Sequence, residues 1–228
     1  MFTIAIDGPS GSGKSTAAKS TARLLGCGYL DTGAMYRAVA VGCMESGIDR
    51  DDSEEISSFC RAMVLDVSVD PDNHYVLLAG RDITEQIRDP EVSAWVSVVA
   101  TNADCRIDLV RRQRLILSSG SFVAEGRDIT TVVAPDAEVR LLLTADPEIR
   151  MARRGAELGG RVDEAGLRDQ VLRRDRDDST LVNFTVAADG VITLDSTFMT
   201  PEEVVTQILE LAEKAGIPVP TPGSADPR

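Results

Sequence analysis

Histidine and lysine are scarce in this chain of 228 residues. His74 is the single histidine and falls in a polar turn, which excludes multi-histidine metal centres and argues against histidine-based catalysis. The only lysines are Lys14, Lys19 and Lys214, so arginine carries nearly all of the positive charge. The planar guanidinium group is suited to phosphate, although most of these arginines are expected on solvated helix faces.

Cysteine is also sparse and is spread along the chain. Cys27, Cys43, Cys60 and Cys105 form no Cys-x-x-Cys pair. This spacing predicts free thiols in a reducing compartment rather than disulfides or a zinc site.

Long hydrophobic runs are absent, and none approaches the roughly 18 apolar residues that span a membrane. The N-terminus enters an apolar strand directly, with no basic stretch before it, so we expect no signal peptide and a cytoplasmic protein. The formal net charge of −13 argues against general nucleic-acid binding. We therefore expect neither a membrane nor a nucleic acid as a partner.

Short apolar runs rich in β-branched residues alternate with helical patterns. Such alternation predicts an α/β fold in which a five-stranded parallel sheet is flanked by helices on both faces. We expect one domain over residues 1–216. The five predicted strands are Phe2–Asp7, Gly28–Asp31, Phe122–Gly126, Val139–Thr144 and Val191–Asp195.

Three segments depart from this alternation. Residues 64–88 contain two β-rich runs around the turn "DPDN" and predict a small β insert. Residues 92–101 are rich in β-branched residues, but the helix start Asp89-Pro90 before them favours a helix. The proline-rich residues 217–228 predict a disordered tail.

One glycine-rich turn carries the clearest chemical signal. Residues 8–15 fit the phosphate-binding pattern G-x-x-x-x-G-K-[ST], between a predicted strand and a predicted helix. Glycines let backbone N–H groups curl around phosphates, and the helix N-terminus adds positive potential. Lys14 would reach the β- and γ-phosphates, and the Ser15 hydroxyl would hold Mg²⁺. The predicted ATP-binding residues here are Gly8, Pro9, Ser10, Gly11, Ser12, Gly13, Lys14, Ser15 and Thr16.

Further charged residues follow other predicted strands. Arg37 comes about one turn into the helix after "LDTG", and Arg127 and Asp128 end the run "FVAEGRD". Ligands of open α/β sheets bind at the carboxyl ends of the strands, so these side chains are expected near the glycine-rich turn. A late cluster, "RRDRDDS" (173–179), supplies the arginines that phosphoryl transfer needs to neutralise charge.

The sequence resembles the bacterial cytidylate kinase family of nucleoside monophosphate kinases over residues 2 to about 213. The resemblance rests on "GPSGSGKST" (8–16), "YLDTGAMYR" (29–37), "LVRRQR" (109–114), "EGRDITTVVAPDA" (125–137) and "RRDRDDST" (173–180). It implies transfer of the γ-phosphoryl group of ATP to CMP or dCMP with Mg²⁺, in a monomer that acts on small nucleotides. It also implies that residues 64–88 belong to the monophosphate-binding part and that residues 150–175 form a lid over ATP.

The resemblance further implies roles for individual residues. Lys14, Arg127 and Arg174 would be catalytic, and Arg153, next to Arg154 at the start of the lid, would bind ATP. Asp178 would bind ribose, and Ser97 and Arg106 would contact cytosine. The full set implied for CMP binding is Thr32, Arg37, Ser97, Arg106, Arg127, Asp128 and Asp178.

Two residues depart from the family pattern. Thr130 replaces a usual glycine, which would be costly if the backbone there had a positive φ. Leu181 replaces a usual arginine facing the acceptor phosphate, so we expect a weakened phosphate cage. Two alternatives stay open: a P-loop kinase with another small acceptor such as UMP or an alcohol, and a nucleotide-binding switch. The arginine and aspartate residues at several strand ends argue against the switch, because a switch needs no acceptor pocket.

Overall fold

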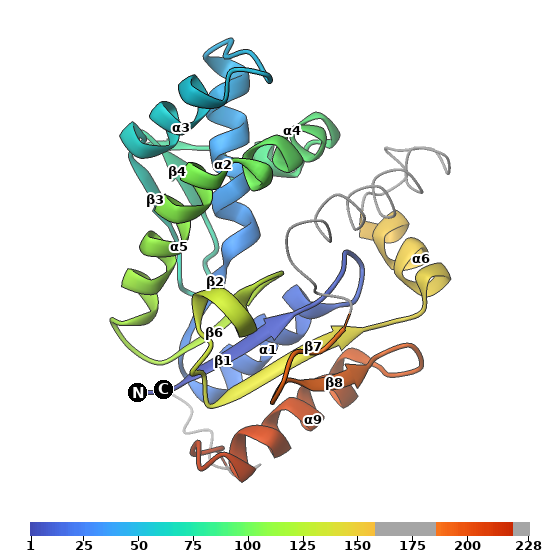
Figure 1. Ribbon diagram of the computed structural model, residues 1–228. Helices are drawn as coiled ribbons and strands as arrows, with labels where there is room; N and C mark the ends of the chain where they lie inside the picture. The colour runs from blue at the N-terminus through green and yellow to red at the C-terminus, as the bar shows by residue number, and fades with distance from the viewer. Residues whose placement is uncertain (158–185, 221–228) are drawn as a thin grey trace.

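The computed structural model describes residues 1–157 and 186–220. Its central sheet has five parallel strands in the order β2-β6-β1-β7-β8, which confirms the predicted α/β class (Figure 1). In register, Asp7 pairs with Gly126 and Asp31 pairs with Glu125. The carboxyl ends of three strands therefore meet at one edge. The strands are β1 (Thr3–Asp7), β2 (Gly28–Asp31), β6 (Phe122–Gly126), β7 (Val139–Thr144) and β8 (Ile192–Asp195).

Each face of this sheet is buried under its own group of helices. Alternate residues of β1 separate the two sides, because Ile4 and Ile6 enter one core cluster and Ala5 enters the other. The first cluster lies under α1 (Lys14–Leu25) and α9 (Pro201–Lys214). The second contains α2 (Thr32–Glu45) and α5 (Ala103–Leu117).

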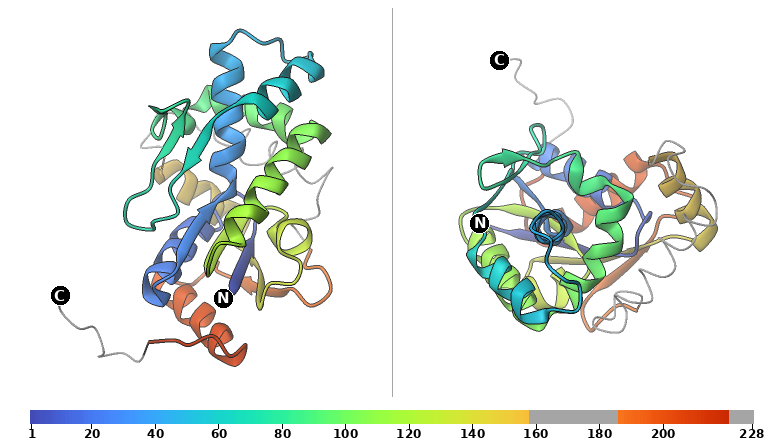
Figure 2. Two further views of the ribbon diagram at one scale, coloured as in Figure 1. Left: turned by 90° about the vertical axis from the view of Figure 1, so that its left-hand side faces the viewer. Right: turned by 90° about the horizontal axis from the view of Figure 1, so that it is seen from above.

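The predicted insert lies beside α2, and the loop between its two main strands reaches the edge strand β2 of the central sheet. Figures 1 and 2 show α2 running from the sheet into a part of the molecule that also holds α3, α4 and the insert. The predicted hairpin is present as antiparallel β3 and β4, and a short third strand, β5, extends it. Residues 92–101 are helical, as expected from the helix start at Asp89. The elements here are α3 (Ser53–Ala62), β3 (Leu65–Val67), β4 (Val76–Leu78), β5 (Arg81–Asp82), the 3-10 helix η1 (Gln86–Arg88) and α4 (Pro90–Thr101).

The packed part of the chain extends past residue 216, the predicted end of the domain. Thr200 and Glu203 form a reciprocal capping box at the start of α9. Beyond its end, Ile217 is only 4% exposed within the cluster under α9, so the expected tail is anchored at its first residue. Residues 221–228 lie outside the described part of the chain. No helix of the described residues is long and apolar enough to cross a membrane.

The remaining described elements flank the glycine-rich turn. They are the short π-helix η2 (Ile129–Val133) after β6 and the helix α6 (Pro147–Glu157) after β7. Most of the lid expected at 150–175 lies outside the described residues, as do Arg174, Asp178 and Leu181.

Candidate functional site

The turn over residues 8–15 adopts a geometry that depends on its glycines. Gly11 and Gly13 have φ of 76° and 88°, and Gly13 is the N-cap of α1. A Cβ on Gly11 would lie 2.4 Å from the carbonyl oxygen of Arg150, so a side chain there is sterically excluded. The guanidinium of Arg150 in turn donates to the carbonyl of Ser10 at 3.1 Å. The loop is therefore clamped against α6, and the start of α1 offers its N–H groups to a ligand.

Lys14 and Ser15 meet one buried carboxylate. Lys14 Nζ lies 3.8 Å from Glu125 Oε2, and the Ser15 hydroxyl donates to Glu125 Oε1 at 2.5 Å. The buried Tyr29 hydroxyl donates to the same Oε1 at 3.1 Å. Burial raises the pKa of Glu125 and the neighbouring Asp31 carboxylate raises it further, while Lys14 and the two hydroxyl donors oppose the change. Glu125 thus orients both P-loop side chains expected to act on phosphate.

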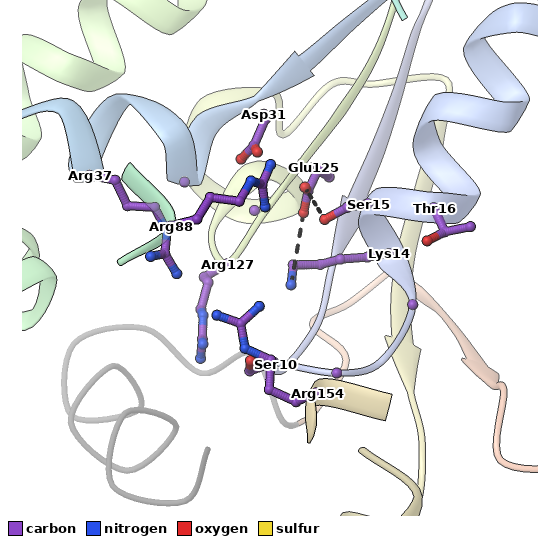
Figure 3. Close-up of a pocket in the computed structure, with 14 residues that line it drawn as sticks. Ser10, Lys14, Ser15, Thr16, Asp31, Arg37, Arg88, Glu125, Arg127 and Arg154 are labelled. Atoms are coloured by element: carbon purple, nitrogen blue, oxygen red, sulfur yellow. Dashed lines mark hydrogen bonds and ion pairs between the residues drawn. The ribbon is translucent and has the colours of Figure 1, made fainter. Parts of the chain in front are cut away.

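Basic side chains from separate elements converge on the pocket beside this cluster. Figure 3 shows Lys14, Arg37, Arg88, Arg127 and Arg154 around it, contributed by α1, α2, η1, the turn after β6 and α6. The lining carboxylates are Asp31 and Glu125. Positive groups therefore predominate, which suits a polyanion such as adjoining phosphate groups.

The insert helps to hold the acceptor side of this pocket. Arg37 Nη1 donates to the Ile87 carbonyl and to the Ser93 hydroxyl, each at 3.1 Å. These bonds fix the arginine between α2 and the insert while it lines the pocket. Thr32 is buried at the start of α2, and its hydroxyl donates to the Glu125 carbonyl at 2.8 Å. Gly126 is required beside it, because an added Cβ would lie 2.4 Å from Thr32 Oγ1.

A second charged pair lies farther from the P-loop. Arg106 of α5 and Asp128 form a hydrogen-bonded ion pair, in which the side chain of Asp128 is 7% exposed and that of Arg106 is 22% exposed. One acidic acceptor and one basic donor so held can recognise a planar polar ring by complementary hydrogen bonds.

Comparison with known families accounts for this arrangement. The family model "Cytidylate kinase" matches residues 4–214. The chain belongs to the cytidylate kinase family. A cytidylate kinase of Cutibacterium acnes is 48% identical over 215 residues, which cover 92% of this chain and 95% of that protein. One of Pelotomaculum thermopropionicum is 44% identical over 212 residues, covering 90% of this chain and 93% of that protein. The expected resemblance is therefore confirmed.

Part of the predicted set lines two neighbouring pockets. Most of the P-loop set, Arg37 and Arg127 line the pocket of Figure 3 together with Arg154. Arg153 points elsewhere: it donates to the Ser196 hydroxyl at 3.1 Å and the Ser196 carbonyl at 2.8 Å. It lines a second pocket on the other side of the P-loop, formed with Gly11, Ser12, Gly13, Thr16, Ala17, Ser196, Met199, Pro201 and Val204.

Ser97 is not brought to either of these pockets. It is partly buried on α4, and its carbonyl accepts a bond from the Thr101 hydroxyl at 2.9 Å. Thr32 and Asp128 follow the carboxyl ends of β2 and β6, and Arg106 of α5 is paired with Asp128. None of these three residues lines the first pocket.

Arg88 and Glu125 are among the residues of this cytidylate kinase family site that were not predicted. Arg88 lines the first pocket from η1, but its sequence context "EQIRDP" carries no motif that points to phosphate. Glu125 belongs to the run "FVAEGRD". A carboxylate near the end of an otherwise apolar strand could have indicated a site residue there. Its burial and its bonds to Lys14 and Ser15 could not be read from spacing.

The backbone at Thr130 does not have the positive φ that would make a residue other than glycine costly there. Within the described residues, Ala79 is the one non-glycine residue with positive φ, so Thr130 is not strained in that way. Its hydroxyl instead donates to Asp7 Oδ2 at 2.6 Å. The departure from glycine therefore adds a buried hydrogen bond at the junction of β1 and the turn after β6.

Proposed function

We propose that this chain transfers the γ-phosphoryl group of ATP to CMP or dCMP, giving ADP and CDP or dCDP. The observation that carries the proposal is the basic pocket beside the P-loop, which Arg37, Arg88 and Arg127 line together with Lys14. The P-loop side of this pocket suits the triphosphate of a donor. The Asp128–Arg106 pair, which begins one residue after Arg127, suits the base of an acceptor.

On the donor side, the P-loop backbone and Lys14 bind the β- and γ-phosphates. The pocket beside Arg153 adjoins the outer face of the same loop and would take the nucleoside end of ATP. Mg²⁺ would be held by the hydroxyl oxygen of Ser15 together with phosphate oxygens of ATP. The ion would neutralise phosphate charge when bound. Glu125 orients Ser15 toward it.

On the acceptor side, Arg37, Arg88 and Arg127 bind the phosphate of CMP. Thr32 shapes the floor beneath it, and Ser97 extends the acceptor surface on α4. Asp128 accepts a hydrogen bond from the cytosine amino group, and Arg106 donates to N3. For residues outside the described part, we propose that Arg174 contacts the transferring group and Asp178 the ribose.

Phosphoryl transfer to CMP requires positioning of the two nucleotides and neutralisation of charge. It does not require a general base. The attacking atom is a phosphate oxygen of CMP that is already ionised at neutral pH, so no side chain must remove a proton. The moving phosphoryl group passes through a loose transition state with charge on its oxygens. Lys14, Arg127 and Arg174 offset that charge.

A coupled assay of ADP release tests this function. We expect release that depends on CMP, and a higher kcat/KM for CMP than for UMP. Uracil reverses the donor and acceptor at both positions that face Asp128 and Arg106. One mispaired buried group costs about 1–3 kcal/mol, so the preference should be on the order of tenfold or more. Equal kcat/KM for both nucleotides would contradict the base assignment, and ADP release without any acceptor would support the switch instead.

A further inference from the structure

Asp7 is a buried carboxylate that the reaction does not use. It ends β1, directly before the P-loop, and is 3% exposed. Its carboxylate accepts three hydrogen bonds: Ile129 N at 2.8 Å, Thr130 N at 2.9 Å and Thr130 Oγ1 at 2.6 Å. All three donors lie in one short turn, 122 or 123 residues away along the chain. No arginine or lysine forms an ion pair with Asp7 in the part of the chain that the structure describes.

These contacts amount to a helix cap supplied from another strand. The first N–H groups of any helix lack partners within it, and a side chain at the N-cap position usually accepts their bonds. Asp128 occupies the N-cap position of η2 and is of a suitable residue type, but its side chain makes no capping bond. The N–H groups of Ile129 and Thr130 are satisfied by Asp7 instead.

The carboxylate of Asp128 therefore serves another partner, Arg106. Because Asp7 already accepts the bonds of the Ile129 and Thr130 N–H groups, the Asp128 carboxylate is not needed as their cap and can point toward α5. We propose that Asp7 and Thr130 act as positioning residues for base specificity: by capping η2 in place of Asp128, they keep the Asp128 carboxylate on Arg106 and directed at the acceptor base. The inference rests on the proposed function for its kinetic consequence, but not for the geometry.

Thr130→Val is the central variant, because it removes one bond to Asp7 with little change of shape. The weakened cap leaves Asp128 able to turn back toward η2. We expect the ratio of kcat/KM for CMP over UMP to fall on the order of threefold to tenfold, the effect of weakening a buried hydrogen bond. KM for CMP should rise, and KM for ATP should stay within about twofold of wild type. Asp7→Asn should lower the ratio further, since its amide group would face donors.

Matched controls separate this role from general destabilisation. Thr21 is fully buried in α1, and its hydroxyl has no hydrogen-bond partner among residues 1–157 and 186–220, so Thr21→Val makes the same chemical change without losing a bond seen there. Thr130→Ser keeps the hydroxyl and should restore discrimination. A purely structural role would reduce the active fraction and lower the rates with CMP and UMP equally, leaving the ratio unchanged. That outcome for Thr130→Val and Asp7→Asn would overturn the inference.

A second measurement does not depend on the substrate. Crystal structures of wild type, Thr130→Val and Asp7→Asn provide this measurement. The wild-type structure should show the Asp128–Arg106 bond. The Asp7→Asn structure should show the Asp128 carboxylate turned toward the N–H groups of η2. An Asp128 still bonded to Arg106 in Asp7→Asn would overturn the inference. A wild type that fails to phosphorylate CMP would refute the proposed function instead, and the crystal structures would still decide the capping role.

Discussion

At the scale of single residues, Glu125 shows how the proposed phosphate-binding arrangement opposes stability. It is a buried carboxylate with Lys14 Nζ 3.8 Å away and with two hydroxyl donors, Ser15 and Tyr29. Burial raises the pKa of Glu125 by more than Lys14 and the two hydroxyl donors lower it. A raised pKa means that the folded state favours the neutral form, so ionised Glu125 costs stability at neutral pH. The same ionised form is the one that can orient Ser15 and balance Lys14.

We therefore expect Glu125→Gln to melt at a higher temperature than wild type at pH 7–8. The stabilising contribution of protonated Glu125 is present below its unfolded pKa of about 4.5 and is lost as pH rises through the higher folded value. The difference in Tm between variant and wild type should thus shrink toward pH 4. Activity should fall roughly 10–100-fold, as for other residues that orient a metal ligand.

Thermal melts from pH 4 to pH 8 and steady-state kinetics measure both effects. Glu210→Gln, at an exposed position on α9, is the matched control and should change neither. A Glu125→Gln protein that melts below wild type at pH 8 would show that the Lys14 and Ser15 contacts outweigh the burial cost.

A second prediction at this scale concerns the effect of Lys14 on turnover. Lys14→Ala should lower kcat by roughly 10²–10³, because the removed charge acts on the phosphates in the transition state. Circular dichroism and the Tm should stay close to those of wild type, since both the ion pair with Glu125 at 3.8 Å and the hydrogen bond to the Pro9 carbonyl at 3.4 Å are long. Normal turnover in a folded variant would remove the P-loop lysine from the mechanism.

At the scale of elements, the tip of the β3–β4 hairpin docks on the edge of the central sheet. Tyr29 N of the edge strand β2 donates to the Val69 carbonyl at 2.8 Å, and Arg23 of α1 forms an ion pair with Asp72. His74 packs its ring against Tyr29, with centroids 5.9 Å apart. The insert that carries Arg88 is thereby tied to α1, the helix that follows the P-loop, and to β2.

His74 makes this docking sensitive to acid. Both ring nitrogens are buried without a hydrogen-bond partner within the described residues, and burial lowers the pKa of the ring. Lys19 and Arg88 lower it further, while Asp31 opposes them. Stability from neutral His74 is therefore present above its ordinary pKa of 6.5 and is lost as pH falls through the lower folded value.

We expect wild type to lose more Tm between pH 7.5 and pH 5.5 than His74→Phe, which cannot take up a proton. The variant should match wild type closely at pH 7.5. Since the chain has no other histidine, the difference between the two melting curves reports this ring alone. Parallel pH profiles for both proteins would show that protonation of His74 does not strain the docked hairpin.

At the scale of the whole molecule, local and total charge have opposite signs. The net charge is −13, yet basic side chains predominate in the pocket. Exposed charges separated by more than the Debye length of about 8–10 Å are largely screened at ordinary salt. The field that a bound nucleotide experiences is therefore set by the pocket rather than by the net charge.

We accordingly expect KM for CMP to rise as KCl is raised from 0.05 to about 0.5 M at fixed free Mg²⁺. Arg88→Gln should raise KM and give a flatter dependence on salt, whereas Arg50→Gln, an exposed arginine stacked on Trp95, should leave both unchanged. A KM that falls with salt would mean that long-range repulsion from the acidic surface dominates.

The sequence by itself determined the features that depend on neighbours in the chain. The P-loop, the five strands and the helix start at Asp89 follow from local patterns, because backbone conformation and burial periodicity act over a few residues. The carboxyl-end rule also placed Arg37 and Arg127 near Lys14. Only the tertiary structure decided which distant groups meet: Arg88 at the pocket, Glu125 beneath Lys14, and Asp7 capping a turn more than 120 residues away. Such contacts depend on strand order and register, and no local pattern encodes which two strand ends lie side by side.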